Sequence, residues 1–97
     1  MDIQAKFNLG RLVATPGALQ AMSDSGQSPE FFLHCHVSGD WGEVTPGDKQ
    51  LNDEALQDGS RILSAYRTLK GVKLWVITEA GDSLDRSLTT ILLPEEY

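Results

Sequence analysis

Residues 61–79, RILSAYRTLKGVKLWVITE, decide the fold class of this chain. The side chains at the start of this stretch alternate with a period of two, which is typical of a strand with two different faces. Lys70 and Gly71 then form a turn signal, and the β-branched and aromatic residues at 72–79 predict a second strand. The stretch therefore predicts an antiparallel β-hairpin.

Two further strands are predicted outside this hairpin. Residues 87–93, SLTTILL, predict a strand that Pro94 ends, because proline cannot donate to a strand ladder. This strand extends the hairpin to a three-stranded meander. Near the start of the chain, residues 6–14 alternate around Gly10, so we expect an N-terminal strand with a bend or bulge at that glycine.

Three short helices are predicted between the first strand and the hairpin. Each begins with a hydroxyl residue followed by proline, which combines an N-cap with a favoured first-turn residue. The start signals are Thr15-Pro16, Ser28-Pro29 and Thr45-Pro46, and the stop signals are Gly26, residues 38–40 and Gly59. The fold class is therefore α+β, with two or three short helices on one face of a small antiparallel sheet.

Length and composition indicate one globular domain. The chain has 97 residues, of which 40% are hydrophobic and 23% charged, so it has room for a single core. The single cysteine, Cys35, cannot form an internal disulfide, which indicates a reducing compartment. The N-terminal residues do not resemble an export signal, and no stretch approaches the roughly 18 apolar residues of a membrane span. We therefore expect a cytoplasmic domain, without a cofactor and without membrane contact.

The charge pattern argues against direct nucleic-acid binding. The formal net charge is -6, whereas surfaces that hold phosphates concentrate lysine and arginine. Residues 40–58 are mainly acidic, residues 59–78 carry basic side chains and no acid, and the rest of the chain is again mainly acidic. We interpret this as a predicted acidic helix that lies near basic strands and compensates their charge.

Residues 81–84, GDSL, match the signature of a hydrolase family that uses the serine as its nucleophile. Such a serine requires a histidine as a base. Both histidines precede Ser83, and the chain is too short for that hydrolase fold. The tetrapeptide is therefore interpreted as part of an exposed hairpin loop.

The run His34-Cys35-His36, with Asp40 downstream, contains residue types that bind soft or borderline metals. In a helix, however, side chains two positions apart diverge by about 200°, so the two histidines could not share an ion. We therefore predict no metal site. Instead, one histidine caps the end of the helix, and Cys35 fills space in the core.

A ribonuclease-like site is the main enzymatic hypothesis. Metal-independent RNA cleavage requires groups that exchange protons and cations that hold the phosphate. Glu79 or His36 could exchange protons, and Arg61 and Arg86 could bind phosphate. The alternative is structural: the two arginines pair with Glu79 and with the acidic helix.

A partner-binding surface is the main non-enzymatic hypothesis. Trp41 lies in a predicted loop and either plugs the core or anchors a partner, whereas Trp75 is mid-strand and is assigned to the core. Residues 46–58 are predicted to carry an apolar stripe of Leu51, Ala55 and Leu56, with acids on the solvent side. The remaining candidate partner-binding residues are the acids Asp48, Asp53, Glu54 and Asp58.

Several runs of the sequence resemble a family of small uncharacterised bacterial proteins, often labelled plasmid-related, that occur on plasmids and integrated mobile elements. The matching segments are 9–19 (LGRLVATPGAL), 39–42 (GDWG), Asn52, 61–66 (RILSAY), 75–79 (WVITE) and 86–97 (RSLTTILLPEEY). The resemblance extends from Phe7 to Tyr97. It implies no assigned activity, and residues 81–84 are an insertion relative to the family pattern.

These observations support three functional hypotheses. The first is a non-enzymatic mobile-element accessory protein that binds a protein partner or a protein–nucleic-acid complex, such as a host defence complex, through its acidic helix. The second is the ribonuclease-like enzyme. The third is a structural or regulatory homodimer that pairs through an exposed sheet edge.

Overall fold

The predicted meander forms three adjacent strands of a four-stranded sheet. The computed structural model describes residues 5–81 and 85–97. Its three C-terminal strands are β2 (Ile62–Arg67), β3 (Lys73–Thr78) and β4 (Leu88–Leu92). Each is antiparallel to the next, with Ala65 opposite Trp75 and Trp75 opposite Leu92. This arrangement confirms the α+β fold class and the meander.

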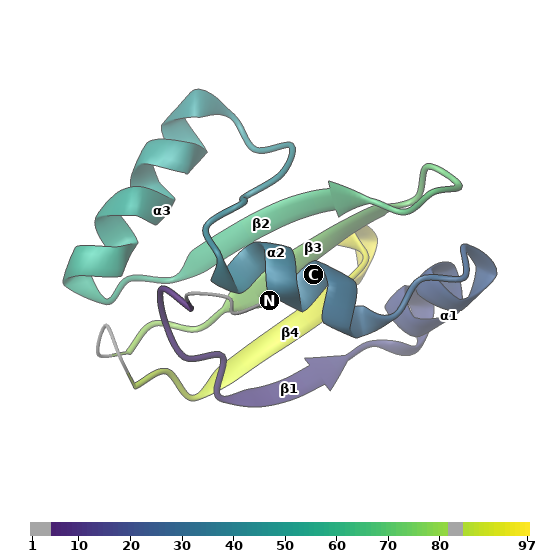
Figure 1. Ribbon diagram of the computed structural model, residues 1–97, viewed down its shortest axis with the longest axis horizontal. Helices are drawn as coiled ribbons and strands as arrows, with labels where there is room; N and C mark the ends of the chain where they lie inside the picture. The colour runs from purple at the N-terminus through teal and green to yellow at the C-terminus, as the bar shows by residue number, and fades with distance from the viewer. Residues whose placement is uncertain (1–4, 82–84) are drawn as a thin grey trace.

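The N-terminal strand makes the sheet mixed rather than antiparallel. Strand β1 (Arg11–Ala14) runs parallel to β4, and the strand order is β1-β4-β3-β2 (Figure 1). The expected fully antiparallel sheet is therefore wrong for this strand. Because helices separate β1 from β2, no tight turn forces β1 to run antiparallel to a neighbour.

Strand β1 is also shorter than the predicted strand at 6–14. It begins only after Gly10, which has a φ of +66°. A Cβ at this position would lie 2.4 Å from the carbonyl oxygen of Arg86, so a side chain would have no space. The chain thus turns at Gly10, and Phe7 packs in the core from the segment before the strand.

The three predicted helices form at the expected positions. They are α1 (Pro16–Asp24), α2 (Pro29–Val37) and α3 (Pro46–Asp58), and a 3-10 turn η1 (Pro94–Glu96) follows β4. The hydroxyls of Thr15 and Thr45 accept the first free N–H groups of α1 and α3, as the N-cap signals predicted. Gly59 has a φ of 81° and ends α3 in the left-handed conformation.

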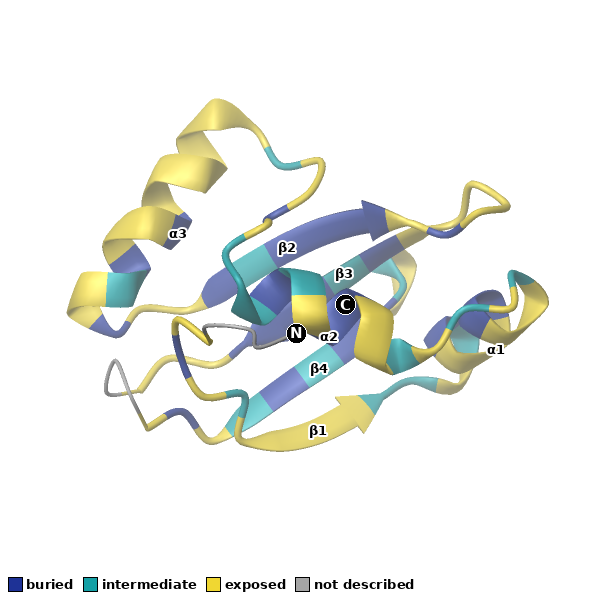
Figure 2. Cartoon of the chain, viewed as in Figure 1, coloured by how far each residue is buried: buried dark blue, intermediate teal, exposed yellow. Residues whose placement is uncertain are grey.

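The core lies between the sheet and the helices. Helix α2 crosses one face of the sheet, α1 lies near the end of β1, and α3 lies beside β2 (Figure 1). Burial is concentrated in β2, β3 and β4, whereas β1 is mainly exposed (Figure 2). One buried cluster contains Ala18, Ala21, Met22, Phe32, Leu33, Tyr66, Leu74, Val76 and Ile91, and a second contains Phe7, Trp41, Ala55 and Ile62.

Candidate functional site

His36 lies at the centre of a buried chain of hydrogen bonds. Its ring joins α2 to two strands, because Nδ1 lies 2.6 Å from Ser64 Oγ and Nε2 lies 2.9 Å from Thr78 Oγ1. Thr78 Oγ1 is in turn 2.7 Å from Thr89 Oγ1, and the Thr89 hydroxyl donates to the carbonyl oxygen of Leu9. The imidazole is fully buried.

The direction of this chain fixes the protonation of the ring. The Thr89 hydroxyl donates its proton to the Leu9 carbonyl, so it accepts a hydrogen bond from the Thr78 hydroxyl. The Thr78 hydroxyl therefore accepts from His36, whose Nε2 must carry the proton. Ser64 donates to the unprotonated Nδ1. A neutral imidazole therefore satisfies every hydroxyl in the chain, and the hydrogen bonds are those of a structural histidine.

The surroundings of His36 disfavour its charged form. Burial, together with the positive charge of Arg86, lowers the pKa of His36 to about 3. The ring has no access to solvent or to a substrate, so it cannot exchange protons with RNA. Of the two histidines in the last turn of α2, His36 points into the core and only His34 is exposed.

Arg86 is a buried structural cation. Only 2% of its surface is exposed, and its guanidinium donates to three main-chain carbonyls. The acceptors are Ser60 O at 2.6 Å, Ala55 O at 2.8 Å and Glu79 O at 3.3 Å. Ala55 lies in the last turn of α3, where the helix dipole favours a cation. Arg86 thus joins α3 to the ends of β2 and β3.

Arg61 and Glu79 lie at the surface without joining His36 or Arg86 in one site. The Arg61 guanidinium donates to the hydroxyl of Tyr97 and lies 5.6 Å from the centre of that ring. Trp75, which was predicted to be core, is half-buried and packs edge-on against Tyr97, with ring centres 5.8 Å apart. Glu79 is exposed at the end of β3. The four ribonuclease candidates therefore do not converge.

The structural alternative was that Arg61 and Arg86 form ion pairs with Glu79 and with the acidic helix. The described part of the chain contains no such ion pair. Among residues 5–81 and 85–97, the ion pairs are Lys49–Asp53 and Arg67–Glu43. Only the second connects the acidic stretch to a basic strand. The charge of Arg86 also acts on the acidic helix, because hydrogen bonds from Ser60 and, after them, the charge of Arg86 lower the pKa of Asp58. Arg61 contacts an aromatic side chain and Arg86 contacts carbonyls instead.

Trp41 plugs the core, which is the first of its two predicted alternatives. Its exposed fraction is 4%, and its ring stacks on Phe7 with centres 6.2 Å apart. The indole Nε1–H donates to Asp53 Oδ1 at 3.1 Å. This bond and the neighbouring lysines lower the pKa of Asp53. Asp53 therefore helps to hold Trp41 in place, and Trp41 does not form a partner anchor on the surface.

The stripe that buries α3 differs from the predicted one. Leu51 is 63% exposed, whereas the next residue, Asn52, is 4% exposed and Ala55 is fully buried. Sequence reasoning assigned Leu51 to the core because it is apolar. The structure places Asn52 there because both ends of its amide bond the main chain of β2.

The shift leaves an apolar residue next to carboxylates on an exposed side of α3, where Asp48 and Leu51 line a pocket shared with Arg61. We define the outer α3 surface as Asp48, Leu51, Glu54 and Asp58. Their spacing of three or four residues places them along one side of the helix. Each of them is exposed, and only Asp58 has a contact that matters to the fold, because it accepts the N–H of Ser60.

The outer edge of β2 is occupied by groups from α3 and from the preceding loop. Asn52 Nδ2 donates to Leu63 O at 2.7 Å, and Leu63 N–H donates to Asn52 Oδ1 at 3.1 Å. Ala65 N–H donates to Trp41 O, and Ala65 O accepts from the N–H of Glu43. Sequence reasoning missed the role of Asn52, because α3 carries two further amide side chains, Gln50 and Gln57, and only the position of β2 distinguishes them.

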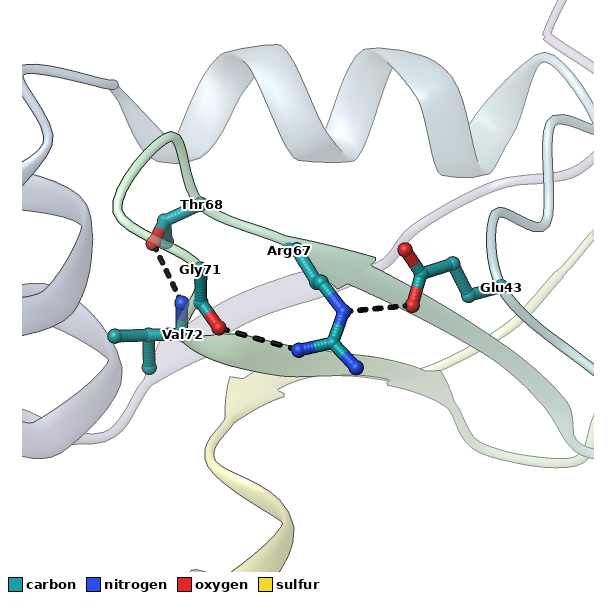
Figure 3. Close-up of polar contacts among 5 residues, drawn as sticks. All are labelled: Glu43, Arg67, Thr68, Gly71 and Val72. Atoms are coloured by element: carbon teal, nitrogen blue, oxygen red, sulfur yellow. Dashed lines mark hydrogen bonds and ion pairs between the residues drawn. The ribbon is translucent and has the colours of Figure 1, made fainter.

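The Arg67 side chain, which we call the side-chain clamp, bonds the preceding loop and the following turn at the end of β2. Arg67 Nε donates to Glu43 Oε1 at 2.9 Å, and a second nitrogen of the same guanidinium donates to Gly71 O at 3.2 Å (Figure 3). In the adjoining turn the Thr68 hydroxyl accepts the N–H of Val72. The loop before α3 and the β2–β3 turn are thereby connected across the strand.

The remaining sequence motifs lie away from these contacts. Within the described residues, no cluster of three or more His, Cys, Asp or Glu side chains could bind a metal ion. The same part of the chain contains no helix with the length and apolar character needed to cross a bilayer. Of the GDSL tetrapeptide, residues 82–84 lie outside the described residues, and Gly81 donates its N–H to Gly59 O.

Taken together, the geometry defines a small α+β protein with an enclosed polar core and an acidic outer helix. Comparison with models of protein families, with curated proteins and with solved structures finds no match for this chain.

Proposed function

We propose that this chain is a non-enzymatic binding module that docks a protein partner through the outer α3 surface. The observation that carries this proposal is the exposed Leu51, which is 63% accessible and lies among the carboxylates Asp48, Glu54 and Asp58. An apolar centre with a charged rim is the usual layout of a protein interface. Of the candidate catalytic groups, His36, Arg61 and Arg86 are used in structural contacts, and the Glu79 side chain is exposed.

The chemistry of the surface selects the kind of partner. Carboxylates repel phosphates, so the partner presents a basic surface of its own rather than bare nucleic acid. The basic groove of a nucleic-acid-handling or host defence complex fits this description. The resemblance to plasmid-related proteins supports the same class of partner, because mobile elements encounter such complexes in their hosts.

The test is capture of bacterial lysate proteins by the tagged chain after nuclease treatment, with mass spectrometry of what remains after washes of rising salt. We compare wild type with the double variant Asp48→Asn and Glu54→Gln. Within residues 5–81 and 85–97 their carboxylates make no hydrogen bond or ion pair, so this variant should fold normally and lose a stoichiometric basic partner. Raising the salt should release the same partner from the wild type.

A matched control removes the same two charges elsewhere. The double variant Asp24→Asn and Glu95→Gln changes exposed acids on α1 and η1 and should retain the partner. Leu51→Ala should weaken capture without changing the charge. Capture that is equal in all variants and insensitive to salt would show that the outer α3 surface is not the docking site.

A further inference from the structure

The free edge of β1 is the second unpartnered surface of the molecule. Arg11 N–H donates to Ser87 O and Thr15 N–H donates to Ile91 O, so the alternate residues of β1 direct their main-chain groups toward β4. The N–H and C=O groups of Leu12 and Ala14 therefore point outward. Among the described residues they have no hydrogen-bond partner, and Figures 1 and 2 show β1 as an uncovered, exposed edge.

The side chains next to this edge form an apolar projection and an apolar groove. Leu12 is 53% exposed. Beside it lies a groove of about 290 Å³ between β1 and the start of α2. The groove is lined by Leu12, Val13, Ala14, Pro29, Glu30, Leu33 and Ile91. Both features lie on the helix side of the same short strand, within two residues of each other.

Charges of opposite sign lie at the two ends of the strand on its other face. Arg11 is exposed, and its side chain has no partner among the described residues. At the other end, the Thr15 hydroxyl donates to Glu96 Oε1 at 2.5 Å, which holds a carboxylate beside the strand. These bonds from Thr15 and from the N–H of Leu93 lower the pKa of Glu96, so the group is charged at neutral pH.

We propose that β1 pairs with β1 of a second copy of this chain, antiparallel and about a two-fold axis through Val13. In this register Leu12 lies opposite Ala14 of the second copy, which forms four main-chain hydrogen bonds across the axis. Leu12 of each copy then lies over the groove of the other. The same register places Arg11 opposite Thr15 of the second copy, next to its Glu96.

Self-complementarity is the reason to assign the edge to a second copy. A two-fold interface uses one patch twice, so every projection needs its receptor on the same patch. Leu12 with the groove, and Arg11 with Glu96, meet this requirement in a single register. The result is a continuous eight-stranded sheet, counted as two copies of the four-stranded sheet. This interface is separate from the outer α3 surface, so either proposal can fail alone.

Sedimentation equilibrium of the full chain, from low micromolar to near-millimolar concentration, tests the assembly. We expect a monomer–dimer equilibrium that Leu12→Lys weakens by about tenfold or more, because the substitution places two charges over the apolar grooves. The matched control is Leu69→Lys, since Leu69 is 80% exposed and lies far from β1 in the β2–β3 turn. It should leave the dimer unchanged. Equal melting temperatures of dilute samples would show that both variants fold.

Disulfide trapping tests the register. In a Cys35→Ser background, Val13→Cys places two thiols opposite each other at a non-hydrogen-bonded pair, where the Cα atoms are about 4.5 Å apart and a disulfide fits. Leu12→Cys instead faces Ala14, so it should crosslink much more slowly. A chain that stays monomeric at all concentrations, or a dimer that Leu12→Lys does not weaken, would overturn the proposal. Faster crosslinking through Leu12→Cys would overturn the register.

Discussion

The two edges of the sheet differ in whether their outward main-chain groups are hydrogen-bonded. At β2, the amide of Asn52 bonds the N–H and C=O of Leu63 as a neighbouring strand would, and the loop around Trp41 does the same for Ala65. At β1, the corresponding groups of Leu12 and Ala14 face outward without partners among the described residues. One edge is closed by the chain itself, and the other is open.

Because the fold covers the β2 edge, the uncovered β1 edge is not a feature that this fold was unable to avoid. Unpaired edges favour association with other strands, and proteins usually protect them with charges, prolines, bulges or covering segments. This chain covers β2 with the amide of Asn52, the loop around Trp41 and the Arg67–Glu43 ion pair. It leaves apolar side chains at β1, where a single lysine would have blocked pairing. Among the described residues, β1 is therefore the edge of this sheet whose main-chain groups are left available for pairing.

The largest expected effect is a loss of stability in acid, where protonation of the buried His36 opposes the hydrogen bonds that join α2 to β2 and β3. His36 bonds Ser64 of β2 and Thr78 of β3, and its folded pKa is lowered from 6.5 to about 3. Below pH 6.5 the unfolded chain binds a proton that the folded chain does not, so stability falls as the pH drops from 6.5 to 3. The shift corresponds to a loss of roughly 4 to 5 kcal/mol at the acid end.

Urea unfolding at a series of pH values measures this dependence. Carboxylates with lowered pKa, such as Asp53 and Asp58, also lose stability in acid, so the informative quantity is the difference between wild type and His36→Gln. This variant should be less stable at pH 7 and flatter between pH 6.5 and 3. His34→Gln, which changes the exposed histidine, should follow the wild type. Parallel profiles for wild type and His36→Gln would mean that the buried ring does not resist protonation.

A smaller effect is expected from opening the β2 edge directly. Asn52→Leu removes both bonds to Leu63 and leaves a main-chain N–H and C=O without partners, which should lower the free energy of unfolding by about 2 to 3 kcal/mol. Hydrogen exchange should show the Leu63 amide losing its protection. In the wild type monomer the Leu12 amide should already exchange fast, so the variant makes Leu63 resemble Leu12, while Ala65 stays bonded to the loop around Trp41.

The neighbouring glutamine supplies the control for that experiment. Gln50→Leu changes an exposed side chain on the same helix and should alter stability by less than about 0.5 kcal/mol. The Asn52 variant should also associate at lower concentration than the wild type, because the β2 edge is then open at Leu63 in addition to the open β1 edge. Protection of Leu63 that persists in Asn52→Leu would mean that another group closes this edge.

The elements of this fold could largely be predicted because their signals are local. The hydroxyl-proline starts place all three helices, and alternation with a turn at Lys70 and Gly71 places the hairpin. The direction of β1 could not be predicted in this way, since it depends on which strand β1 meets after folding. Its length was overestimated because the clash that Gly10 avoids involves a carbonyl far along the chain.

The site was harder to predict because the relevant partners are distant in sequence. Acids on α3 could be assigned to the surface from composition. That Asn52 is buried and Leu51 exposed could not, because it depends on the position of β2 beside the helix. Likewise, His36 and Arg86 have residue types common in active sites. Only the fold shows that hydroxyls and carbonyls enclose them.

The smallest expected effect separates the side-chain clamp from the main-chain closure of β2. Arg67→Ala removes the bonds to Glu43 and Gly71, but both charged side chains are about half exposed, so the loss should stay below about 1 kcal/mol. The Ala65 amide should keep its exchange protection, because it donates to Trp41 O rather than to the clamp. Lys73→Ala on the neighbouring strand controls for the lost charge. If Ala65 instead became exposed to exchange, the ion pair would be needed to hold the loop on β2. The closed edge would then depend on surface charge and would open as salt is raised, unlike the amide bonds of Asn52.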